Sequence, residues 1–379
     1  MHNNTRLFSL PRWRVTCWLT DAGRDVPSEI RTALIGSLFG TLPIFAGGVL
    51  NTLAVSTLVA YRIPQKQFLI WCVLEYGICL TRLIVLVVAQ RAAAERRKTP
   101  TDIYILLGLA WAASVGYGTL ISLLSGDWVV ATLACLSAAA MVGGISFRNF
   151  GAPRLAGAMI VLTLGSCCIA APFTGEPLLM ITFLQIPFYL ASMSAAGFRL
   201  NKMLIVTMRA ERENAYRAQH DSLTGLRNRA GLAEAIAARR DGLSALLYLD
   251  LDGFKAVNDT HGHGTGDQLL RAVAARLGES TRPSDVVARL GGDEFVILSE
   301  LLAPAALIKL GERLVTQISA PYDLAQDRTV TIGVSIGIAL APEHGTDLAS
   351  LLSAADRALY EAKALGKSRA ALAPLRKAA

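Results

Sequence analysis

Six long apolar runs in the first half of the chain constrain its fold more than any other feature of the sequence. They cover approximately residues 32–61, 67–90, 103–125, 128–147, 155–175 and 177–198. A helix needs about 20 apolar residues to cross a bilayer, and each run supplies that length. Five of the six runs contain no charged residue. The sequence therefore predicts a multi-span α-helical membrane domain over residues 32–198, in contact with membrane lipid.

Charge and cysteine content separate this half from the rest of the chain. Only 17% of the 379 residues are charged, against about a quarter in an ordinary soluble domain, and the deficit lies in the first half. All six cysteines precede residue 169, so the second half has no disulfide framework and suits a reducing compartment. The adjacent Cys167 and Cys168 lie in an apolar run, where packing is a simpler interpretation than a redox or metal site.

Basic residues beside the apolar runs predict the orientation of the chain. They follow the second, fourth and sixth runs, whereas the short loops after the third and fifth runs have none. Cytoplasmic loops are enriched in Lys and Arg, so the N-terminal tail (residues 1–31) and the second half are expected in the cytoplasm. Arg62 and Lys66 in the first loop oppose this orientation. The net charge of +8 fits these membrane flanks better than it fits nucleic-acid binding.

Two features of this half have two interpretations each. Glu75 and Arg82 lie seven residues apart on one face of the second run, where a charge is either functional or packed against a neighbouring helix. Residues 199–219 lack Pro and Gly and are rich in helix formers, which predicts a linker helix continuing out of the sixth run. Its apolar positions fit either a short dimer seam or a plain connecting helix, because a coiled coil needs three or four heptads.

The second half alternates expected helices and strands. Helices are expected near 230–240, 264–278, 303–318 and 347–365, and strands near 243–251, 286–290, 294–299 and 330–340. The middle two strands flank Gly291-Gly292-Asp293-Glu294, which predicts a β-hairpin with a tight corner. This mixture predicts an α/β or α+β sheet with helices packed on it.

Acidic residues gather at the expected end of one strand and at the hairpin. Asp250 and Asp252 alternate along the strand and so share a face, with the Leu251 carbonyl between them. Asp250 and Asp293 could converge on one or two Mg²⁺ ions, since Mg²⁺ prefers oxygen ligands completed by substrate phosphates. The alternatives are that these acids cap loops, or that water solvates a hairpin tip.

Residues suited to a nucleotide follow the first strand. Gly253-Phe254-Lys255 predicts a tight turn whose N–H groups can face phosphate oxygens, and Lys255 adds a positive charge. Asn258 and Asp267 carry the amide and the carboxylate needed to bind a guanine edge, although each alone is equally typical of a turn or a helix start.

Two other pairs of residues are more ambiguous. Lys363 and Lys367 are expected four residues apart on one helix face, where they either neutralise a triphosphate or simply end a helix with positive charge. His261 and His263 lack the further Cys or His of a metal site, so they fit turn residues better.

These residues occur in order within one set of motifs. The motifs are Asp221…Asn228-Arg229, Asp250-Leu251-Asp252-Gly253-Phe254-Lys255-Ala256-Val257-Asn258-Asp259, Gly262-His263-Gly264-Thr265-Gly266-Asp267, Arg289-Leu290-Gly291-Gly292-Asp293-Glu294-Phe295, Ser335-Ile336-Gly337 and Ala354–Lys363. Over about residues 220–372 the set resembles the GGDEF domain of diguanylate cyclases. The resemblance implies a nucleotidyl-cyclase-like fold with a central, mainly antiparallel sheet. Together with the six apolar runs, it predicts a membrane-anchored protein of the bacterial inner membrane, with a six-helix transmembrane sensor domain at 32–198, a GGDEF domain at 220–373 and a tail at 374–379.

The resemblance implies an activity and the residues that carry it. The activity is condensation of two GTP into cyclic di-GMP with release of two pyrophosphates. The implied metal ligands, for Mg²⁺ or alternatively Mn²⁺, are Asp250, the Leu251 carbonyl and Asp293. The implied catalytic groups are Glu294, Asp293 and Lys255, and the implied substrate contacts are Phe254, Asn258, Asp267, Gly291, Lys363 and Lys367. Since each domain would hold one GTP, a symmetric homodimer is implied as well.

One further motif bears on regulation. Arg282-Pro283-Ser284-Asp285 shortly precedes Gly291 and resembles the Arg-x-x-Asp site through which cyclic di-GMP inhibits this family, although four such residues also occur by chance. Two other functions stay open. One is a catalytically silent membrane receptor for GTP or cyclic di-GMP, and the other is a cyclase that makes a different cyclic nucleotide.

Overall fold

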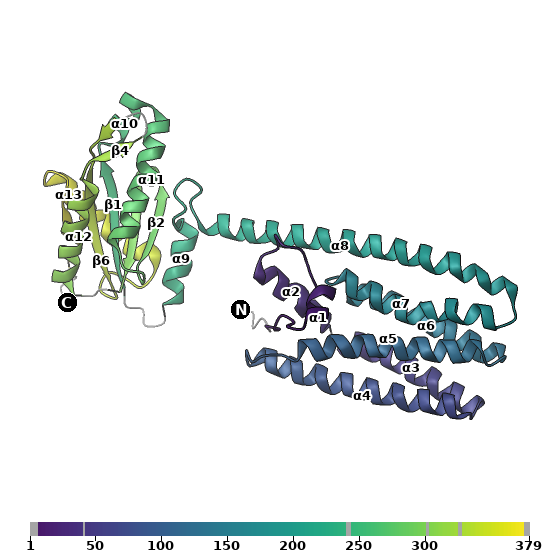
Figure 1. Ribbon diagram of the computed structural model, residues 1–379. Helices are drawn as coiled ribbons and strands as arrows, with labels where there is room; N and C mark the ends of the chain where they lie inside the picture. The colour runs from purple at the N-terminus through teal and green to yellow at the C-terminus, as the bar shows by residue number, and fades with distance from the viewer. Residues whose placement is uncertain (1–6, 41, 240–243, 301–302, 325–327, 375–379) are drawn as a thin grey trace. The chain divides into compact units, whose positions relative to one another are not determined.

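The computed structural model describes residues 7–40, 42–239, 244–300, 303–324 and 328–374, and the chain divides into two compact units. The helical unit comprises Met1–Ala210, and the sheet unit comprises Glu211–Ala379. Figure 1 shows the helices of the first and the layered sheet and helices of the second. Each unit has a hydrophobic core of its own.

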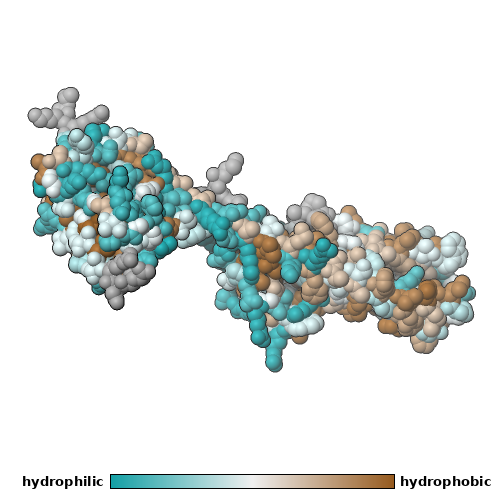
Figure 2. Space-filling model, turned by 90° about the horizontal axis from the view of Figure 1, so that it is seen from above, coloured by the Kyte–Doolittle hydropathy of each residue, from teal (hydrophilic) through white to brown (hydrophobic). Residues whose placement is uncertain are grey.

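Long apolar helices make up most of the helical unit. Its elements are α1 (Arg14–Leu19), α2 (Ser28–Leu38), α3 (Leu42–Arg62), α4 (Lys66–Ala94), α5 (Thr101–Leu123), α6 (Trp128–Arg148), α7 (Pro153–Ala170), η1 (Ala171–Phe173), η2 (Pro177–Ile181) and α8 (Thr182–Gln219). Among the described residues, five helices are long and apolar enough to cross a membrane: α4, α5, α6, α7 with η1, and η2 with α8. Figure 2 shows apolar side chains over much of the visible surface of this unit. The composition and length of these helices are consistent with membrane anchoring.

One of the expected spans is divided in the structure, and another continues as predicted. The first apolar run was expected to be continuous over 32–61, but it is divided into α2 and α3, with Gly40 between them at φ +49°, a backbone conformation that favours glycine. The prediction that a helix continues out of the sixth run is confirmed, because α8 extends without a break to Gln219. Within α8, Leu204 and Met208 pack against Val26, Ile30 and Leu34.

The N-terminal segment packs onto the helices. The Phe8 ring stacks on Phe39 with centroids 4.2 Å apart, and Phe39 stacks on Tyr104 at 4.5 Å. The Asp102 carboxylate at the start of α5 accepts hydrogen bonds from the backbone N–H groups of Arg12 (2.9 Å) and Trp13 (3.1 Å). The described part of the expected N-terminal tail is therefore a folded part of the helical unit.

A five-stranded sheet with the order β2-β3-β1-β6-β7 forms the centre of the sheet unit. The strands are β1 (Ser244–Asp252), β2 (Val286–Gly291), β3 (Glu294–Ser299), β6 (Gly333–Ala341) and β7 (Ala370–Leu372); β4 (Tyr322–Leu324) and β5 (Arg328–Val330) form a separate pair. All neighbours in the large sheet are antiparallel except β6 and β7. The prediction of a mainly antiparallel central sheet is confirmed.

Helices cover both faces of this sheet. They are α9 (Arg229–Ala238), α10 (Phe254–His261), α11 (His263–Ser280), α12 (Pro304–Ile318) and α13 (Leu348–Ala364). Alternate residues of β1 divide between two cores: Leu247, Leu249 and Leu251 pack with α10, α11 and α12, whereas Leu246 and Tyr248 pack with α13. Because side chains alternate along a strand, the second face also receives Asp250 and Asp252.

Several elements of the sheet unit were not predicted. The expected strand over 330–340 is divided, since Val330 pairs with Tyr322 in the small β4–β5 hairpin and β6 begins only at Gly333. Helix α10 follows Gly253 at φ +91°, where a turn alone was expected. The strand β7 adds a parallel edge to β6.

Candidate functional site

Strand register brings the acidic residues of two segments together. Asp250, near the end of β1, lies directly opposite Glu294, the first residue of β3, and the Leu251 N–H donates to the Asp293 carbonyl at 3.3 Å. Opposed residues of an antiparallel pair have Cβ atoms about 5 Å apart. We call Asp250, Asp293 and Glu294 the acidic edge. The hairpin predicted from the Gly-Gly corner is confirmed, and it places these three carboxyl groups at one end of the sheet.

Two glycines shape the turn beside the acidic edge. Gly291 has φ +152° and Gly292 has φ +51°, conformations that side-chain-bearing residues rarely adopt. Among the described residues, no atom lies within 4 Å of the place where a Cβ on Gly291 would stand. A ligand can therefore approach the backbone of the hairpin at this point.

The charges at the acidic edge interact strongly. Burial and the neighbouring Asp250 carboxylate raise the pKa of Asp293, and Lys363 opposes this effect. Lys363 extends from α13, and its Nζ lies 2.7 Å from Asp250 Oδ1. On the same face, burial and the Glu294 carboxylate raise the pKa of Tyr248 well above its usual value. Carboxylates this close repel one another unless a cation joins them.

The donor set of the acidic edge fits a hard cation held partly by its substrate. Within the described residues, no cluster of three or more His, Cys, Asp or Glu side chains is arranged to hold a metal. Asp250 and Asp293 supply two carboxylates, and the next residue after Asp250, Leu251, supplies a backbone carbonyl. Mg²⁺ is usually bound by one or two carboxylates and completed by water and phosphate oxygens, so these oxygens are sufficient for it.

Asp252 accepts hydrogen bonds from two serines that the sequence did not suggest as its partners. Its Oδ2 accepts hydrogen bonds from Ser335 Oγ (2.8 Å) and from the Ser368 N–H (3.1 Å). Its Oδ1 has no partner among the described residues, although it is buried. The side chain therefore joins the end of β1 to the segment that follows α13. Alternation with Asp250 was the signal for its place on this face.

The expectation that Lys363 and Lys367 share a helix face is wrong. Helix α13 ends at Ala364, and Gly366 (φ +112°) and Lys367 (φ +62°) turn the chain away from the helix axis. The Gly366 N–H donates to the Lys363 carbonyl and the Lys367 N–H donates to the Ala362 carbonyl, which ends the helix. Lys363 is thus directed to Asp250, and Lys367 is an exposed residue of the following turn.

The residues expected to contact a nucleotide lie on α10 and α11. Asn258 stands against Gly266: a Cβ built at Gly266 would be 1.9 Å from Asn258 Oδ1, and that buried oxygen has no partner among the described residues. Asp267, the next residue of α11, is exposed. The two expected guanine contacts therefore meet at the α10–α11 junction, where the close approach requires glycine.

Phe254 and Lys255 begin α10 and point in different directions. The Phe254 side chain is 9% exposed and belongs to the core, whereas Lys255 is exposed. Only the backbone of Phe254 is therefore placed to meet a ligand. Its N–H and that of Lys255 lie in the first turn of the helix, where backbone N–H groups have no partner within the helix and favour anions.

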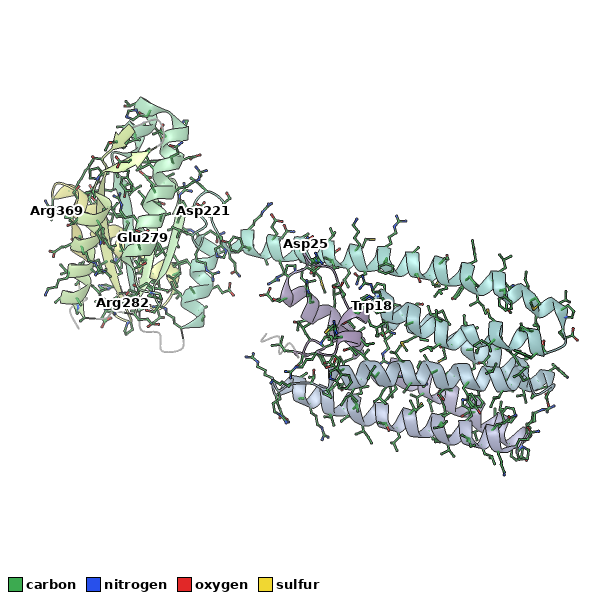
Figure 3. All side chains as sticks on the ribbon, viewed as in Figure 1. Trp18, Asp25, Asp221, Glu279, Arg282 and Arg369 are labelled. Atoms are coloured by element: carbon green, nitrogen blue, oxygen red, sulfur yellow. The ribbon has the colours of Figure 1, made fainter. Side chains whose placement is uncertain are left out.

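Arg282 and Asp285 form a turn at the opposite end of β2 from the hairpin. The Asp285 N–H donates to the Arg282 carbonyl, and the Arg282 N–H donates to Asp285 Oδ2, both at 2.9 Å. Figure 3 labels Arg282, whose side chain is exposed. Strand β2 has six residues and a strand rises about 3.3 Å per residue, so the turn lies roughly 20 Å from the acidic edge. The turn is therefore remote from the acidic edge.

Sequence reasoning gave no role to a third set of polar residues, Asp221, Arg289 and the Gly292 carbonyl. Arg289 Nη1 donates to Asp221 Oδ1 at 2.9 Å, and its Nε and Nη2 donate to the Gly292 carbonyl at 3.1 and 2.8 Å. One guanidinium therefore joins the turn after α8 to the hairpin. The place of Arg289 just before the Gly-Gly corner was the available signal.

Comparison with known proteins gives this unit a family. Residues 218–369 match the family described as "Diguanylate cyclase, GGDEF domain". The bifunctional diguanylate cyclase/cyclic di-GMP phosphodiesterase MucR of Pseudomonas aeruginosa is 47% identical over 166 residues, which are 42% of this chain and 24% of MucR. The diguanylate cyclase TpbB of the same species is 42% identical over 168 residues, covering 42% of this chain and 39% of TpbB.

A solved structure is also similar to this unit. The GGDEF domain of DgcB from Caulobacter crescentus, solved in complex with c-di-GMP, is 34% identical, and the match covers 41% of this chain and 96% of that one, with a TM-score of 0.37. Residues 218–369 are therefore a GGDEF domain with diguanylate cyclase homologues. The chain spans between about a quarter and two fifths of the length of the two curated relatives, and its match with them lies in this domain.

Proposed function

We propose that the protein is a diguanylate cyclase, which condenses two GTP into cyclic di-GMP and releases two pyrophosphates. The observation that carries the proposal is the pairing of Asp250 with Glu294, which sets Asp293 and Lys363 beside the same carboxylate. Carboxylates for a divalent cation and a lysine for phosphate oxygens are what phosphoryl transfer requires at one point. The curated relatives named as cyclases support the same activity.

Each residue has a proposed part in the reaction. Asp250, the Leu251 carbonyl and Asp293 would hold Mg²⁺, or Mn²⁺ in its place, which supplies positive charge to the reacting phosphate. Glu294 orients the attacking 3′-hydroxyl and assists the metal site. Asn258 and Asp267 bind guanine through the α10–α11 junction. The GTP phosphates contact the backbone of Phe254 and Gly291 and the side chains of Lys255, Lys363 and Lys367.

The cyclase proposal includes a homodimer. One domain binds one GTP, and the product joins two, so two sites must face each other across a two-fold axis. In α8, Leu200 and Val206 are 56% and 58% exposed, which leaves apolar positions for a partner helix. The proposed location is the bacterial inner membrane, with a multi-pass helical unit and both the N-terminus and the GGDEF domain in the cytoplasm.

Product inhibition is proposed at the Arg282–Asp285 turn. The Arg282 side chain is exposed and its guanidinium can bind phosphate in a forked geometry. Asp285 Oδ1 has no partner among the described residues, so an acceptor is left for the guanidinium or for a guanine edge.

The test uses the full-length protein in detergent with GTP and Mg²⁺, and mass spectrometry of the products. We expect cyclic di-GMP from the wild type and none from Asp293→Ala, while Glu279→Gln, a change at an exposed position near the end of α11, keeps the activity. The wild-type rate should fall as product accumulates, and Arg282→Ala should remove that fall. Binding of GTP by a folded dimer without any product would instead favour a catalytically silent receptor.

A further inference from the structure

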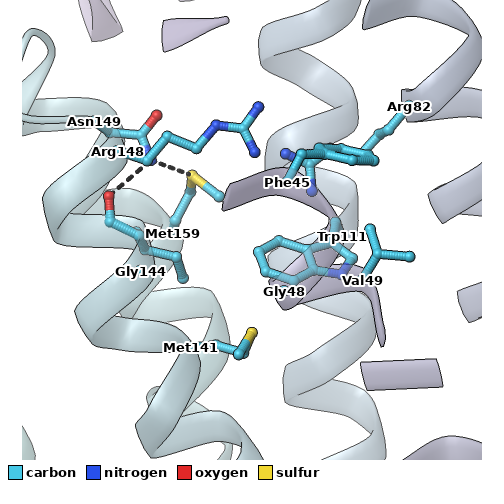
Figure 4. Close-up of a pocket in the computed structure, with 11 residues that line it drawn as sticks. Phe45, Gly48, Val49, Arg82, Trp111, Met141, Gly144, Arg148, Asn149 and Met159 are labelled. Atoms are coloured by element: carbon cyan, nitrogen blue, oxygen red, sulfur yellow. Dashed lines mark hydrogen bonds between the residues drawn. The ribbon is translucent and has the colours of Figure 1, made fainter. Parts of the chain in front are cut away.

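A cavity lies in the core of the helical unit, separate from the GGDEF domain. Its volume is about 100 Å³, and residues of α3, α4, α5, α6 and α7 line it. Figure 4 shows its walls, among them the rings of Phe45 and Trp111 and the side chain of Met159. Its charged lining groups are Arg82, within α4, and Arg148, the last residue of α6.

Both arginines have donors without acceptors. Arg82 is 4% exposed, and its Nε has no hydrogen-bond partner among the described residues. Arg148 donates through Nε to the Leu38 carbonyl at 3.2 Å, but its buried Nη2 likewise has none there. A guanidinium is a planar set of five donors, and a buried donor left unpaired costs free energy.

The two guanidinium groups line the same cavity and lie against the same two aromatic rings. The Cζ atoms of Arg82 and Arg148 lie 5.5 and 5.4 Å from the Phe45 ring centroid, and 6.0 and 5.5 Å from that of Tyr104. In Figure 4 they extend toward Phe45 from α4 and α6 on the two sides of the view. A ring face attracts each cation but carries no net charge, so two like charges stay uncompensated.

The nearby acids do not balance this pair. Glu75 is fully buried about two turns before Arg82 in α4, and its oxygens accept from Ser114 Oγ (2.6 Å) and Cys79 Sγ (3.8 Å). No ion pair within the described part of the chain joins Glu75 to either arginine. Asp102, near Tyr104 in sequence, is engaged by the N-terminal segment. One buried carboxylate therefore stands against two buried cations.

We propose that this cavity binds a small oxyanion, a carboxylate or phosphate group held between Arg82 and Arg148. Arginine forks match the two oxygens of such a group, and the anion would satisfy the orphan donors and the excess charge together. The volume admits a group of only a few heavy atoms, with Trp111 and Phe45 against any apolar part. The group belongs either to a free solute or to a lipid headgroup. Intramembrane charges commonly mark ligand sites, and this pair lies in the helical unit, outside the residues proposed to bind GTP.

The test places the full-length protein in nanodiscs of phosphatidylcholine. Sodium acetate and sodium phosphate are titrated against sodium chloride at equal ionic strength, and thermal unfolding and tryptophan fluorescence are followed. We expect acetate or phosphate to raise the unfolding midpoint, because a ligand stabilises the state that binds it. Adding the anion should change the tryptophan fluorescence of the wild type and leave that of Trp111→Phe unchanged. Arg148→Met should weaken the apparent affinity by about tenfold or more, the loss expected for a charge-assisted contact.

Arg154→Met is the matched control. Arg154 lies in the next helix, pairs with Asp21 at 3.3 Å and stands over Trp18, outside the cavity, so this variant should respond as the wild type does. If Arg148→Met does not fold, Arg148→Lys keeps the charge without the fork and should bind more weakly. A response to phosphatidylglycerol nanodiscs alone would assign the oxyanion to a lipid headgroup. No response to acetate, phosphate or phosphatidylglycerol, or an equal response in Arg148→Met, would overturn the proposal.

Discussion

At the scale of single residues, Arg289 links the first motif of the GGDEF set, at Asp221, to the Gly-Gly hairpin. Its side chain is only 10% exposed, and it holds Asp221 on one side and the Gly292 carbonyl on the other. Asp221 Oδ1 also accepts from the Thr224 N–H and hydroxyl. The turn that follows α8 is thereby tied to the glycine corner beside the acidic edge.

Replacing Asp221 by Asn should destabilise this turn in a pH-dependent way. Burial raises the pKa of Asp221, but hydrogen bonds from Thr224 and Arg289 lower it by more, so this pKa lies below its usual 3.8. A carboxyl group whose pKa is lower in the folded state stabilises the fold at any pH above its pKa in the unfolded state. That contribution is lost as the pH falls through its pKa in the folded state. We expect Asp221→Asn to cost about 1–3 kcal/mol at pH 7, as for hydrogen bonds to a charged group.

Thermal unfolding of both proteins between pH 8 and pH 3 measures this difference. The difference in unfolding free energy between wild type and Asp221→Asn should be constant down to about pH 5. It should become smaller below the usual carboxyl pKa of 3.8. A difference that persists unchanged at pH 3 would show that Asn harms the turn by shape alone.

Gly266 offers a residue-scale test of nucleotide contact. A Cβ there would lie 1.9 Å from Asn258 Oδ1, so Gly266→Ala must displace the amide. We expect the KM for GTP to rise about 10–100-fold, the loss of one or two hydrogen bonds, with a smaller change in kcat. Gly264→Ala is the matched control, because no described atom lies within 4 Å of a Cβ at that position of the same helix. Equal kinetics in both variants would remove Asn258 from the binding site.

At the scale of elements, the sequence predicted the helices and strands that are long enough to have a periodic pattern or that are joined by recognisable turn residues. The hairpin of β2 and β3 and the long helices follow from turn glycines and periodicity, whereas the mainly antiparallel sheet was implied by the resemblance to GGDEF domains. The β4–β5 pair and β7 were missed, since strands of three residues are too short to have a period. The division of residues 32–61 and the turn that carries Lys367 away from the helix face of Lys363 were missed, because Gly40 and Gly366 act through positive φ, which composition does not reveal.

The end of α13 has a testable consequence for the site. Gly366 at φ +112° lets the chain turn so that the Ser368 N–H reaches Asp252. Gly366→Ala should cost about 1–2 kcal/mol in strain, or about 2–4 °C in the unfolding midpoint per kcal/mol for a unit of this size. Gly278→Ala, inside α11 with no described atom within 4 Å of its Cβ, should be neutral or stabilising. Equal midpoints for both variants would show that the turn accommodates a side chain.

At the scale of the whole molecule, the contacts of one basic residue bear on the membrane orientation. Arg62 opposed the distribution of basic loops, but its Nε lies 2.7 Å from Asp127 Oδ2 at the start of α6. The end of α3 and the start of α6 therefore lie at the same end of the helical unit, and an acid neutralises the exceptional base there. This pairing is what an alternating up-and-down arrangement of α3 to α6 requires. The sequence could not supply it, because the two residues are 65 positions apart.

Cysteine labelling in intact cells tests the orientation directly. In a Cys17→Ser background, Glu176→Cys places a thiol in the exposed loop before α8, and Glu279→Cys places one on the exposed face of α11. The remaining native cysteines lie within the helices proposed to span the membrane. A membrane-impermeant maleimide should label Glu176→Cys in intact cells and Glu279→Cys only after permeabilisation, because basic loops stay in the cytoplasm. Labelling in the reverse order would invert the proposed topology and would place the GGDEF domain away from cytoplasmic GTP. Labelling of both in intact cells would contradict a membrane between the two positions.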